Sequence, residues 1–284
     1  SPIDPAYSAL GETATPEALE EYRVQHGLND SFFVQYGRYL WNMLHGDLGT
    51  YGVGTSNHVS DLVAQALPVT LQLTFLGLLF AVLLSFPLGV LAALYRDRWP
   101  DQVIRVFSVI GIGTPSFWLA ALMVLGFVGT LPVSGPLPAL TEDPSGWFLR
   151  MLLPSIALAV PVVGQMTRVV RTSMVEELDR DYVRTAIGGG IPKRIVVARN
   201  VLRNALITPV TVLGLRIGYL MGGAVVIEII FSIDGMGKVL LKGIQENWVT
   251  LVQGGALVVA IAFIVVNIIV DMLYLLINPR IRSV

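Results

Sequence analysis

The sequence contains no cysteine and only three histidines in its 284 residues. The lack of cysteine excludes a disulfide framework, and it also excludes metal or redox chemistry that needs a thiolate. His26, His45 and His58 all lie near the start of the chain, and their spacing is unlike that of metal ligands on one helix. We therefore expect no metal site.

Charged residues are also scarce. They make up 14% of the sequence, whereas an ordinary soluble domain has about 25%. The formal net charge is -1, which argues against a nucleic-acid partner because such a partner usually selects a strongly basic face. Together with the 54% of hydrophobic residues, the low charge indicates that lipid is the main solvent of this chain.

Long apolar runs are what the sequence has in abundance. A helix needs about 20 apolar residues to cross a bilayer, and five runs are long enough. They cover residues 67–94, 104–131, 148–170, 205–231 and 251–277. Several are apolar on every face, unlike the amphipathic helices of a soluble protein. We predict an all-α integral membrane protein with five spans in this sequence.

The placement of Lys and Arg predicts how these spans are oriented. Positive residues in short connections favour the cytoplasm, and they crowd residues 95–105, residues 168–203 and the C-terminal end. We therefore expect the 168–203 connection and the C-terminus to be cytoplasmic, and residues 1–66 to be extracytoplasmic.

Residues 1–66 are hydrophilic and need an apolar segment to carry them across the membrane, so we expect a further N-terminal span upstream of this sequence. The segment itself is predicted to contain short helices. Thr15, Pro16 and Glu17 together predict a helix start and Gly27 its end, and a second helix is expected over residues 31–45.

Residues 181–200, DYVRTAIGGGIPKRIVVARN, form a basic stretch between apolar runs. Residues 180–187 favour one short helix, the glycines weaken it, and Ile191 and Pro192 favour the start of a second helix that runs to Arg203. A long connection with its own helices and apolar residues is a candidate docking surface. The alternative is a basic loop that only sets the orientation of the spans, and the residues alone leave both open.

A resemblance to a known family runs through nearly the whole sequence. Residues 178–186, followed by Gly190 and residues 203–206, resemble the cytoplasmic signature loop of membrane subunits from ATP-binding-cassette importers. Further motifs resemble the dipeptide, oligopeptide and nickel branch in the same order along the chain. They are HGDLGT at 45–50, LPVTL at 67–71, FPLGV at 86–90, GGAVVIE at 222–228, FSIDGMG at 231–237 and NPRIR at 278–282. Residues 187–189 depart from the pattern, because arginine, alanine and lysine are more usual there.

The resemblance implies the type I importer fold, with residues 1–66 outside and a permease domain over residues 67–284 that contains a cytoplasmic coupling loop at 172–204. It implies a permease subunit of an ATP-driven importer for peptides or related small solutes, which forms half of the translocation path. Residues 176–203 would couple this subunit to cytosolic ATPases. The coupling residues would be Glu177, Asp179, Asp181, Tyr182, Val183, Arg184, Thr185, Ala186, Gly190, Lys193 and Arg194.

The partners that the resemblance implies are a second homologous permease, two cytosolic ATP-binding subunits, an extracytoplasmic substrate-binding protein and the lipid of a bacterial inner membrane. ATP and Mg would be used by the partner subunits, with no cofactor bound here. The residues agree, since no Gly-x-x-x-x-Gly-Lys-Ser/Thr phosphate loop occurs. No clustered acid, base or metal set at one depth indicates an enzyme.

Two features inside the spans are candidates for the translocation path. The sequence at 111–116, GIGTPS, breaks the second span and frees backbone carbonyls, so Thr114, Pro115 and Ser116 are candidates. Charged groups inside spans cost about 2.5 to 3.5 kcal/mol on insertion scales, and this makes Arg216 and Glu228 candidates as well. Pairing with another helix or with a partner subunit is the open alternative for them.

An ion-coupled secondary transporter or channel is the competing class of function. It would explain intramembrane Glu228 and Asp271, and broken helices are common at its binding sites. It does not explain a basic two-helix cytoplasmic loop.

Overall fold

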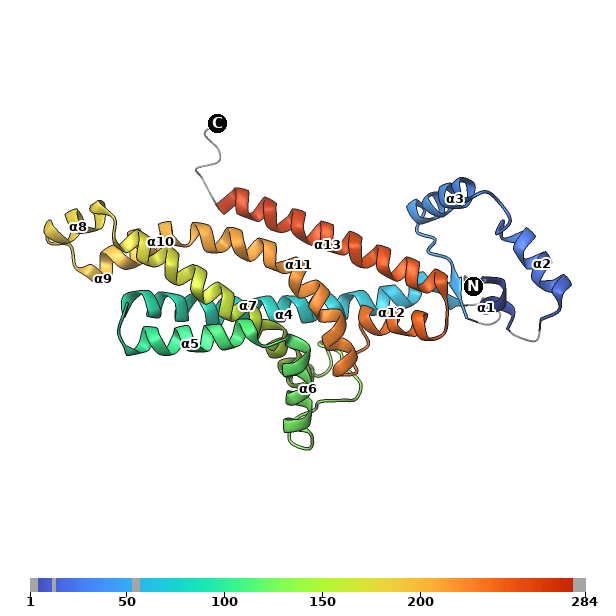
Figure 1. The fold of residues 1–284 in the computed structure, drawn as a ribbon, viewed down its shortest axis with the longest axis horizontal. Helices are drawn as coiled ribbons and strands as arrows, with labels where there is room; N and C mark the ends of the chain where they lie inside the picture. The colour runs from blue at the N-terminus through green and yellow to red at the C-terminus, as the bar shows by residue number, and fades with distance from the viewer. Residues whose placement is uncertain (1–4, 12–13, 53–56, 278–284) are drawn as a thin grey trace. The chain divides into compact units, whose positions relative to one another are not determined.

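The structure is a computed structural model that describes residues 5–11, 14–52 and 57–277. The 278–282 motif and the side chain of Asp271 lie outside the described part. Among the described residues the regular structure is helical, apart from one antiparallel pair of two-residue strands (Figure 1). These strands are β1 (Thr50–Tyr51) and β2 (Asn57–His58).

The chain divides into two compact units. The first unit contains residues Ser1–Thr70 and Ile233–Ala262. Its helices are α1 (Pro5–Leu10), α2 (Pro16–Gln25), α3 (Phe32–Leu44), the start of α4 (Val59–Leu94), α12 (Met236–Gln245) and the start of α13 (Val249–Ile277). Its core joins α4, α12 and α13 through Val59, Val63, Ala66, Met236, Val239 and Leu251. Helix α12 was not predicted from the sequence.

The two helices expected near the N-terminus are confirmed as α2 and α3. The Thr15 side chain caps α2 by accepting a hydrogen bond from the backbone N–H of Ala18 at 3.3 Å. Gly27, just beyond the end of α2, has a φ of +63°, a value that glycine adopts without strain.

The second unit contains residues Leu71–Ser232 and Phe263–Val284. Its elements are the rest of α4 and α13, together with α5 (Trp99–Gly113), α6 (Ser116–Phe127), α7 (Pro144–Leu178), α8 (Asp181–Gly188), α9 (Lys193–Val196), the π-helix η1 (Val197–Val201), α10 (Leu202–Ala205) and α11 (Ile207–Ile230). Helix α7 packs against α5, α6 and α11 (Figure 1). It is therefore the central helix of this unit.

Helices α4, α7, α11 and α13 are each long and apolar enough to cross a membrane. Helices α5 and α6 pass the same test only together, and they are bent by 98° at the break between them. The five predicted apolar segments are thus all found, but the second is a broken pair. Helices α4 and α7 also begin before the predicted spans, because hydropathy locates the apolar part of a helix and not its ends.

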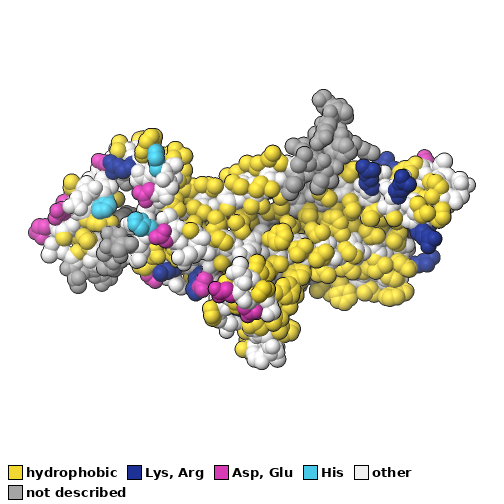
Figure 2. Space-filling model, turned by 180° about the vertical axis from the view of Figure 1, so that it is seen from behind, with side chains coloured by type: hydrophobic (Ala, Val, Ile, Leu, Met, Phe, Trp, Pro, Cys, Tyr) yellow, Lys and Arg dark blue, Asp and Glu magenta, His cyan; other side chains and the backbone are white. Residues whose placement is uncertain are grey.

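The surface of the second unit is typical of a chain in lipid. Figure 2 shows apolar side chains over the long helices and Lys and Arg side chains gathered at the end that carries α8 and α9. Large side chains such as Phe75, Phe107 and Leu125 are more than 60% exposed in this chain. An apolar surface of this kind needs lipid or another membrane subunit against it.

Candidate functional site

The α8–α10 segment (residues 179–206) follows directly from the end of α7. Helix α8 ends in a Schellman motif, in which the N–H of Gly190 donates to the carbonyl of Ile187 at 3.0 Å and the N–H of Ile191 donates to that of Ala186 at 3.1 Å. Gly190 has a φ of +90°. The predicted helix, glycine break and second helix are confirmed, and the motif explains why a glycine stands at residue 190.

The inner face of this segment is packed on the rest of the unit. Val183 is buried with Met174 of α7 and Val196 of α9, and Tyr182 and Ala186 pack on the same cluster. Residues of α4, η1 and α10 complete this cluster. The segment is therefore anchored to α7 and is not a loose loop.

Tyr182 adds a polar anchor to the apolar one. Its hydroxyl donates to Glu177 Oε1 at 3.0 Å, and the other Glu177 oxygen lies 3.0 Å from Arg180 Nε. Burial raises the pKa of the Tyr182 phenol. The phenol is thus held in its neutral, hydrogen-bond-donating form.

The outer face of the segment is exposed and has a mixed character. Ile187, Ile191 and Ile195 are 41%, 46% and 45% exposed. Basic and polar side chains surround them, and the exposed predicted coupling residues are Asp179, Asp181, Arg184, Thr185, Gly190, Lys193 and Arg194. Exposed apolar side chains within a polar rim are typical of a protein-binding surface.

The eleven predicted coupling residues thus separate into an outward set and an anchoring set. Seven are exposed, whereas Tyr182, Val183 and Ala186 face the cluster. The eleventh, Glu177, binds Tyr182. The exposed Asp179 binds Arg96, with Arg96 Nη1 donating to Asp179 Oδ2 at 2.8 Å. The exposed isoleucines belong to the outer face although they were not named as coupling residues.

The helix that leads from α9 into α10 contains a π-helical turn, η1, over Val197–Val201. Such turns are rare and often lie at functional sites. The chain then breaks again at Leu206 before α11 begins.

The predicted path residues lie on different elements. Thr114 is the C-cap of α5, with its Oγ1 donating to the carbonyl of Ile110 at 2.7 Å. Pro115 is the N-cap of α6 and Ser116 its first residue, so all three stand at the 98° bend. The break was predicted correctly, but its angle was not predictable from the residues.

Arg216 and Glu228 lie on α11, which packs against α6 and α7. Arg216 is partly buried, and its Nε has no hydrogen-bond partner in the described part of the chain. Glu228 is fully buried. Glu228 therefore does not face open space within this chain.

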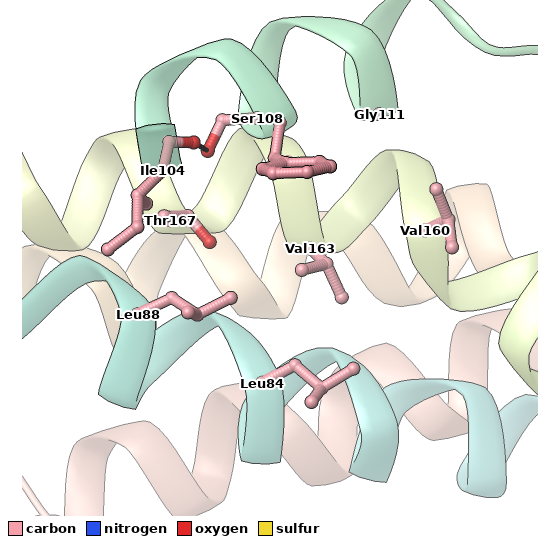
Figure 3. Close-up of a pocket in the computed structure, with 10 residues that line it drawn as sticks. Leu84, Leu88, Ile104, Ser108, Gly111, Val160, Val163 and Thr167 are labelled. Atoms are coloured by element: carbon pink, nitrogen blue, oxygen red, sulfur yellow. Dashed lines mark hydrogen bonds between the residues drawn. The ribbon is translucent and has the colours of Figure 1, made fainter. Parts of the chain in front are cut away.

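A mostly apolar cavity of about 190 Å³ lies between α4, α5 and α7 (Figure 3). It is lined by Leu84, Leu88, Ile104, Phe107, Ser108, Gly111, Val160, Val163, Gly164 and Thr167. The Thr167 hydroxyl is buried and has no hydrogen-bond partner among the residues that the structure describes. None of the predicted path residues lines this cavity.

Two arginines of α7, the buried Arg150 and the partly buried Arg171, were not recognised from the sequence as structural sites. Arg150 is 2% exposed and donates to the carbonyls of Pro132, Gly135 and Phe231. Arg171 binds the buried carboxylate of Asp101 through two hydrogen bonds. Their only sequence signal is an arginine near the end of an apolar run, and for Arg171 the orientation rule had already accounted for it.

No group of three metal-binding side chains occurs within residues 5–11, 14–52 and 57–277. The structure combines apolar spans around a central helix, a broken span and an anchored helical segment with an exposed outer face. They define a membrane transport subunit.

Comparison with known proteins gives the family. The chain belongs to the family described as binding-protein-dependent transport system inner membrane component, whose model matches residues 85–283. A separate model for the N-terminal part of such membrane components matches residues 1–74. The chain is therefore a multi-pass inner-membrane permease subunit of an ATP-binding-cassette importer and not itself an enzyme. The alternative of an ion-coupled transporter or channel is not supported.

Several curated relatives are similar along almost their whole length. A protein of Brucella abortus named as a peptide transport system permease is 38% identical over 99% of this chain and 90% of its own length. The D,D-dipeptide transport system permease DdpB of Escherichia coli K12 is 38% identical over 99% and 89%. The glutathione transport system permease GsiC of Salmonella paratyphi A is 37% identical over 99% and 90%.

Solved structures agree on the fold. A chain from an inward-facing MetNI methionine ABC transporter has a TM-score of 0.59 and 17% identity, with coverage of 76% of this chain and 96% of that chain. A chain from an amino acid ABC transporter has a TM-score of 0.58 and 15% identity over 78% and 94%. The predicted type I importer fold is confirmed.

Proposed function

We propose that this permease forms half of a path that imports peptides or related small solutes, and that its α8–α10 segment is the element gripped by a cytosolic ATPase. The substrate class is supported by the relatives, which are named for peptide, dipeptide and glutathione transport. The observation that supports the coupling role is that the segment has one face anchored to the spans and one face exposed. Its inner face is packed on α7, and its outer face exposes three isoleucines and several cations.

In this proposal the α8–α10 segment and the C-terminus lie in the cytoplasm, and residues 1–66 lie outside. A second homologous permease completes the path, two ATP-binding subunits bind ATP and Mg, and an extracytoplasmic binding protein delivers the substrate. The excess of Lys and Arg around residues 168–203 supports this orientation.

The two-sided build suggests how force would reach the spans. A partner that binds the outer face and moves would displace α7 together with the segment, because Val183 and Tyr182 hold the segment to α7. Alternating access then follows from movement of the attached helices around the path. Thr114, Pro115, Ser116, Arg216 and Glu228 are the residues that we propose to line or shape this path.

The test uses two neighbouring glycines as a matched pair. Gly190→Val forces a β-branched residue into a φ of +90°, at a cost of roughly 1 to 3 kcal/mol in the α8 termination. Gly188→Ala falls on a helical residue with nothing within 4 Å of the added Cβ, so it should be neutral or stabilise α8 by about 1 kcal/mol. Both variants would be reconstituted with the partner subunits in vesicles, with transport and substrate-stimulated ATPase measured together.

We expect Gly190→Val to assemble but to hydrolyse ATP with little transport, whereas Gly188→Ala should remain coupled. A segment that serves only to orient the spans would tolerate Gly190→Val, since its arginines are retained. Wild-type coupling in Gly190→Val would therefore contradict the proposed role.

A further inference from the structure

Asp101 is a fully buried carboxylate in the first turn of α5. Its Oδ1 accepts a hydrogen bond from Arg171 Nε at 2.6 Å, and its Oδ2 accepts one from Arg171 Nη2 at 2.7 Å. The backbone N–H of Asp97 donates to the same Oδ2 at 2.9 Å. A bidentate contact of this kind fixes the orientation of both side chains as well as their separation. It therefore joins the start of α5 rigidly to α7.

The same two helices approach each other closely further along. A Cβ added at Gly164 of α7 would lie 2.5 Å from the Ser108 carbonyl oxygen of α5, and one added at Gly111 of α5 would lie 3.2 Å from the Val160 carbonyl oxygen. On the side of α4, the cavity of about 190 Å³ lies at this level (Figure 3). Helix α5 is thus packed backbone to backbone against α7, with room between it and α4.

The two ends of this helix pair meet the two elements named in the proposed function. The C-terminal end of α7 leads into the α8–α10 segment, and Met174 packs with Val183 there. The C-terminal end of α5 is the break at Thr114 and Pro115, where the chain turns by 98° into α6. A displacement of α7 that α5 follows would therefore change the position of the break.

We infer that Asp101 and Arg171 are positioning residues that make α5 move with α7, so that movement of the α8–α10 segment reaches the break at Thr114 and Pro115. This inference rests on the proposed function, because it assumes that the segment is the driven element. The pair suits this role because Asp101 is fully buried, so losing Arg171 leaves a buried carboxylate without its bidentate partner at the helix contact.

Arg105 provides a matched control for Arg171. Its Nε lies 3.7 Å from the same Asp101 Oδ1, but its side chain is 45% exposed, whereas that of Arg171 is 19% exposed. Because its Arg105 end is solvent-exposed and 3.7 Å is too long for a hydrogen bond, this contact contributes little. Arg105→Met removes a cation near Asp101 without removing the bidentate link, so it separates an effect of local charge from an effect of the link.

The experiment compares Arg171→Met, Arg171→Lys and Arg105→Met in the reconstituted complex of this chain with its partner permease, ATPase subunits and binding protein. The first readout is substrate transported per ATP hydrolysed. The second is the distance between spin labels at Val106 of α5 and Ala198 of η1, both exposed, measured with and without trapped ATP. Two introduced cysteines carry the labels in a chain that has none of its own.

We expect the label distance to be the same in both nucleotide states for the native link and for Arg105→Met. In Arg171→Met it should differ between the states, and transport per ATP should fall by about fivefold or more while ATPase activity persists. Arg171→Lys, which keeps the charge but not the bidentate geometry, should give an intermediate coupling. A purely structural role would instead lower assembly, with transport and ATPase falling together.

Wild-type coupling or an unchanged label distance in Arg171→Met would overturn the inference. If Arg171→Met does not assemble, Asp101→Asn keeps the side-chain shape and decides by the same two readouts. Gly190→Val is measured alongside. If it uncouples and Arg171→Met does not, only the link is refuted, whereas coupling in both variants refutes the proposed function.

Discussion

The two ends of α7 hold their neighbours in different ways. Near its N-terminal end, Arg150 is almost fully buried and is bound by backbone carbonyls from residues 132, 135 and 231. Near its C-terminal end, Arg171 is bound by a carboxylate, that of Asp101. The carbonyls around Arg150 hold a connection and a helix end to α7. The carboxylate bound by Arg171 holds a single helix, α5, to α7.

This difference indicates different work at the two ends. The carbonyls of Pro132 and Gly135 belong to the connection between α6 and α7, and Phe231 is the C-cap residue of α11. Arg150 therefore joins α7, the α6–α7 connection and the end of α11 in one cluster. Arg171 links two long helices side by side, which suits the transfer of movement between them.

The N-terminal end is also fixed by a cap. Asp143 Oδ1 accepts hydrogen bonds from the Gly146 N–H at 2.9 Å and from the Ser145 hydroxyl at 2.8 Å. These hydrogen bonds, the Gly146 one first, lower the pKa of the exposed Asp143 carboxyl. The stabilisation is therefore present above the ordinary carboxyl pKa and is lost as the pH falls through the lowered one.

The largest effect on stability should come from breaking the cluster around Arg150. Arg150→Met removes four hydrogen bonds from the guanidinium to backbone carbonyls, and hydrogen bonds to charged groups contribute about 1.5 to 3 kcal/mol each. We expect the unfolding free energy of the complex in nanodiscs to fall by about 3 kcal/mol or more. Thermal unfolding measures this. Arg150→Lys keeps a cation but offers fewer fixed donors, so its unfolding temperature should lie between those of the wild type and Arg150→Met. An unchanged unfolding temperature in Arg150→Met would contradict a stabilising role for these hydrogen bonds.

A smaller effect is expected at the middle of α7. Gly164→Ala places a Cβ 2.5 Å from the Ser108 carbonyl oxygen, so α5 and α7 must separate, at a cost of about 1 to 3 kcal/mol for overpacking. Gly113→Ala is the control, because it is also helical and has nothing within 4 Å of the added Cβ. Unfolding of the two variants in the same nanodiscs compares them. Equal stability would show that the helices are not closely packed at Gly164.

The sequence predicted those features that depend on neighbouring residues. Thr15 before Pro16 predicted the start of α2, and the glycines and Pro192 predicted the break between α8 and α9. Apolar runs predicted the spans, because the length of a bilayer crossing is a local property. The resemblance added the family and the role of the α8–α10 segment, which the residues alone had left open.

The contacts that organise α7 could not be predicted in this way. Asp101 and Arg171 are 70 residues apart, and Arg150 and Phe231 are 81 apart. Each pairing depends on which faces of the helices meet, and apolar runs that face lipid carry little information about facing. The 98° turn at Thr114 and Pro115 has the same origin, since a proline permits a break and packing decides its angle.

The smallest effect should come from the exposed tie at the C-terminal end of α7. Arg96 Nη1 lies 2.8 Å from Asp179 Oδ2, but these side chains are 49% and 59% exposed, and such pairs contribute roughly 0 to 1 kcal/mol. Arg96→Gln should therefore leave both unfolding and transport per ATP close to wild type, and raising the salt concentration should reduce even that small difference. The measurement is the same coupling assay as for Arg171→Met. Uncoupling in Arg96→Gln would mean that movement reaches α5 through the exposed turn at residues 95–98. It would contradict the view that Asp101 and Arg171 are the main link between α7 and α5.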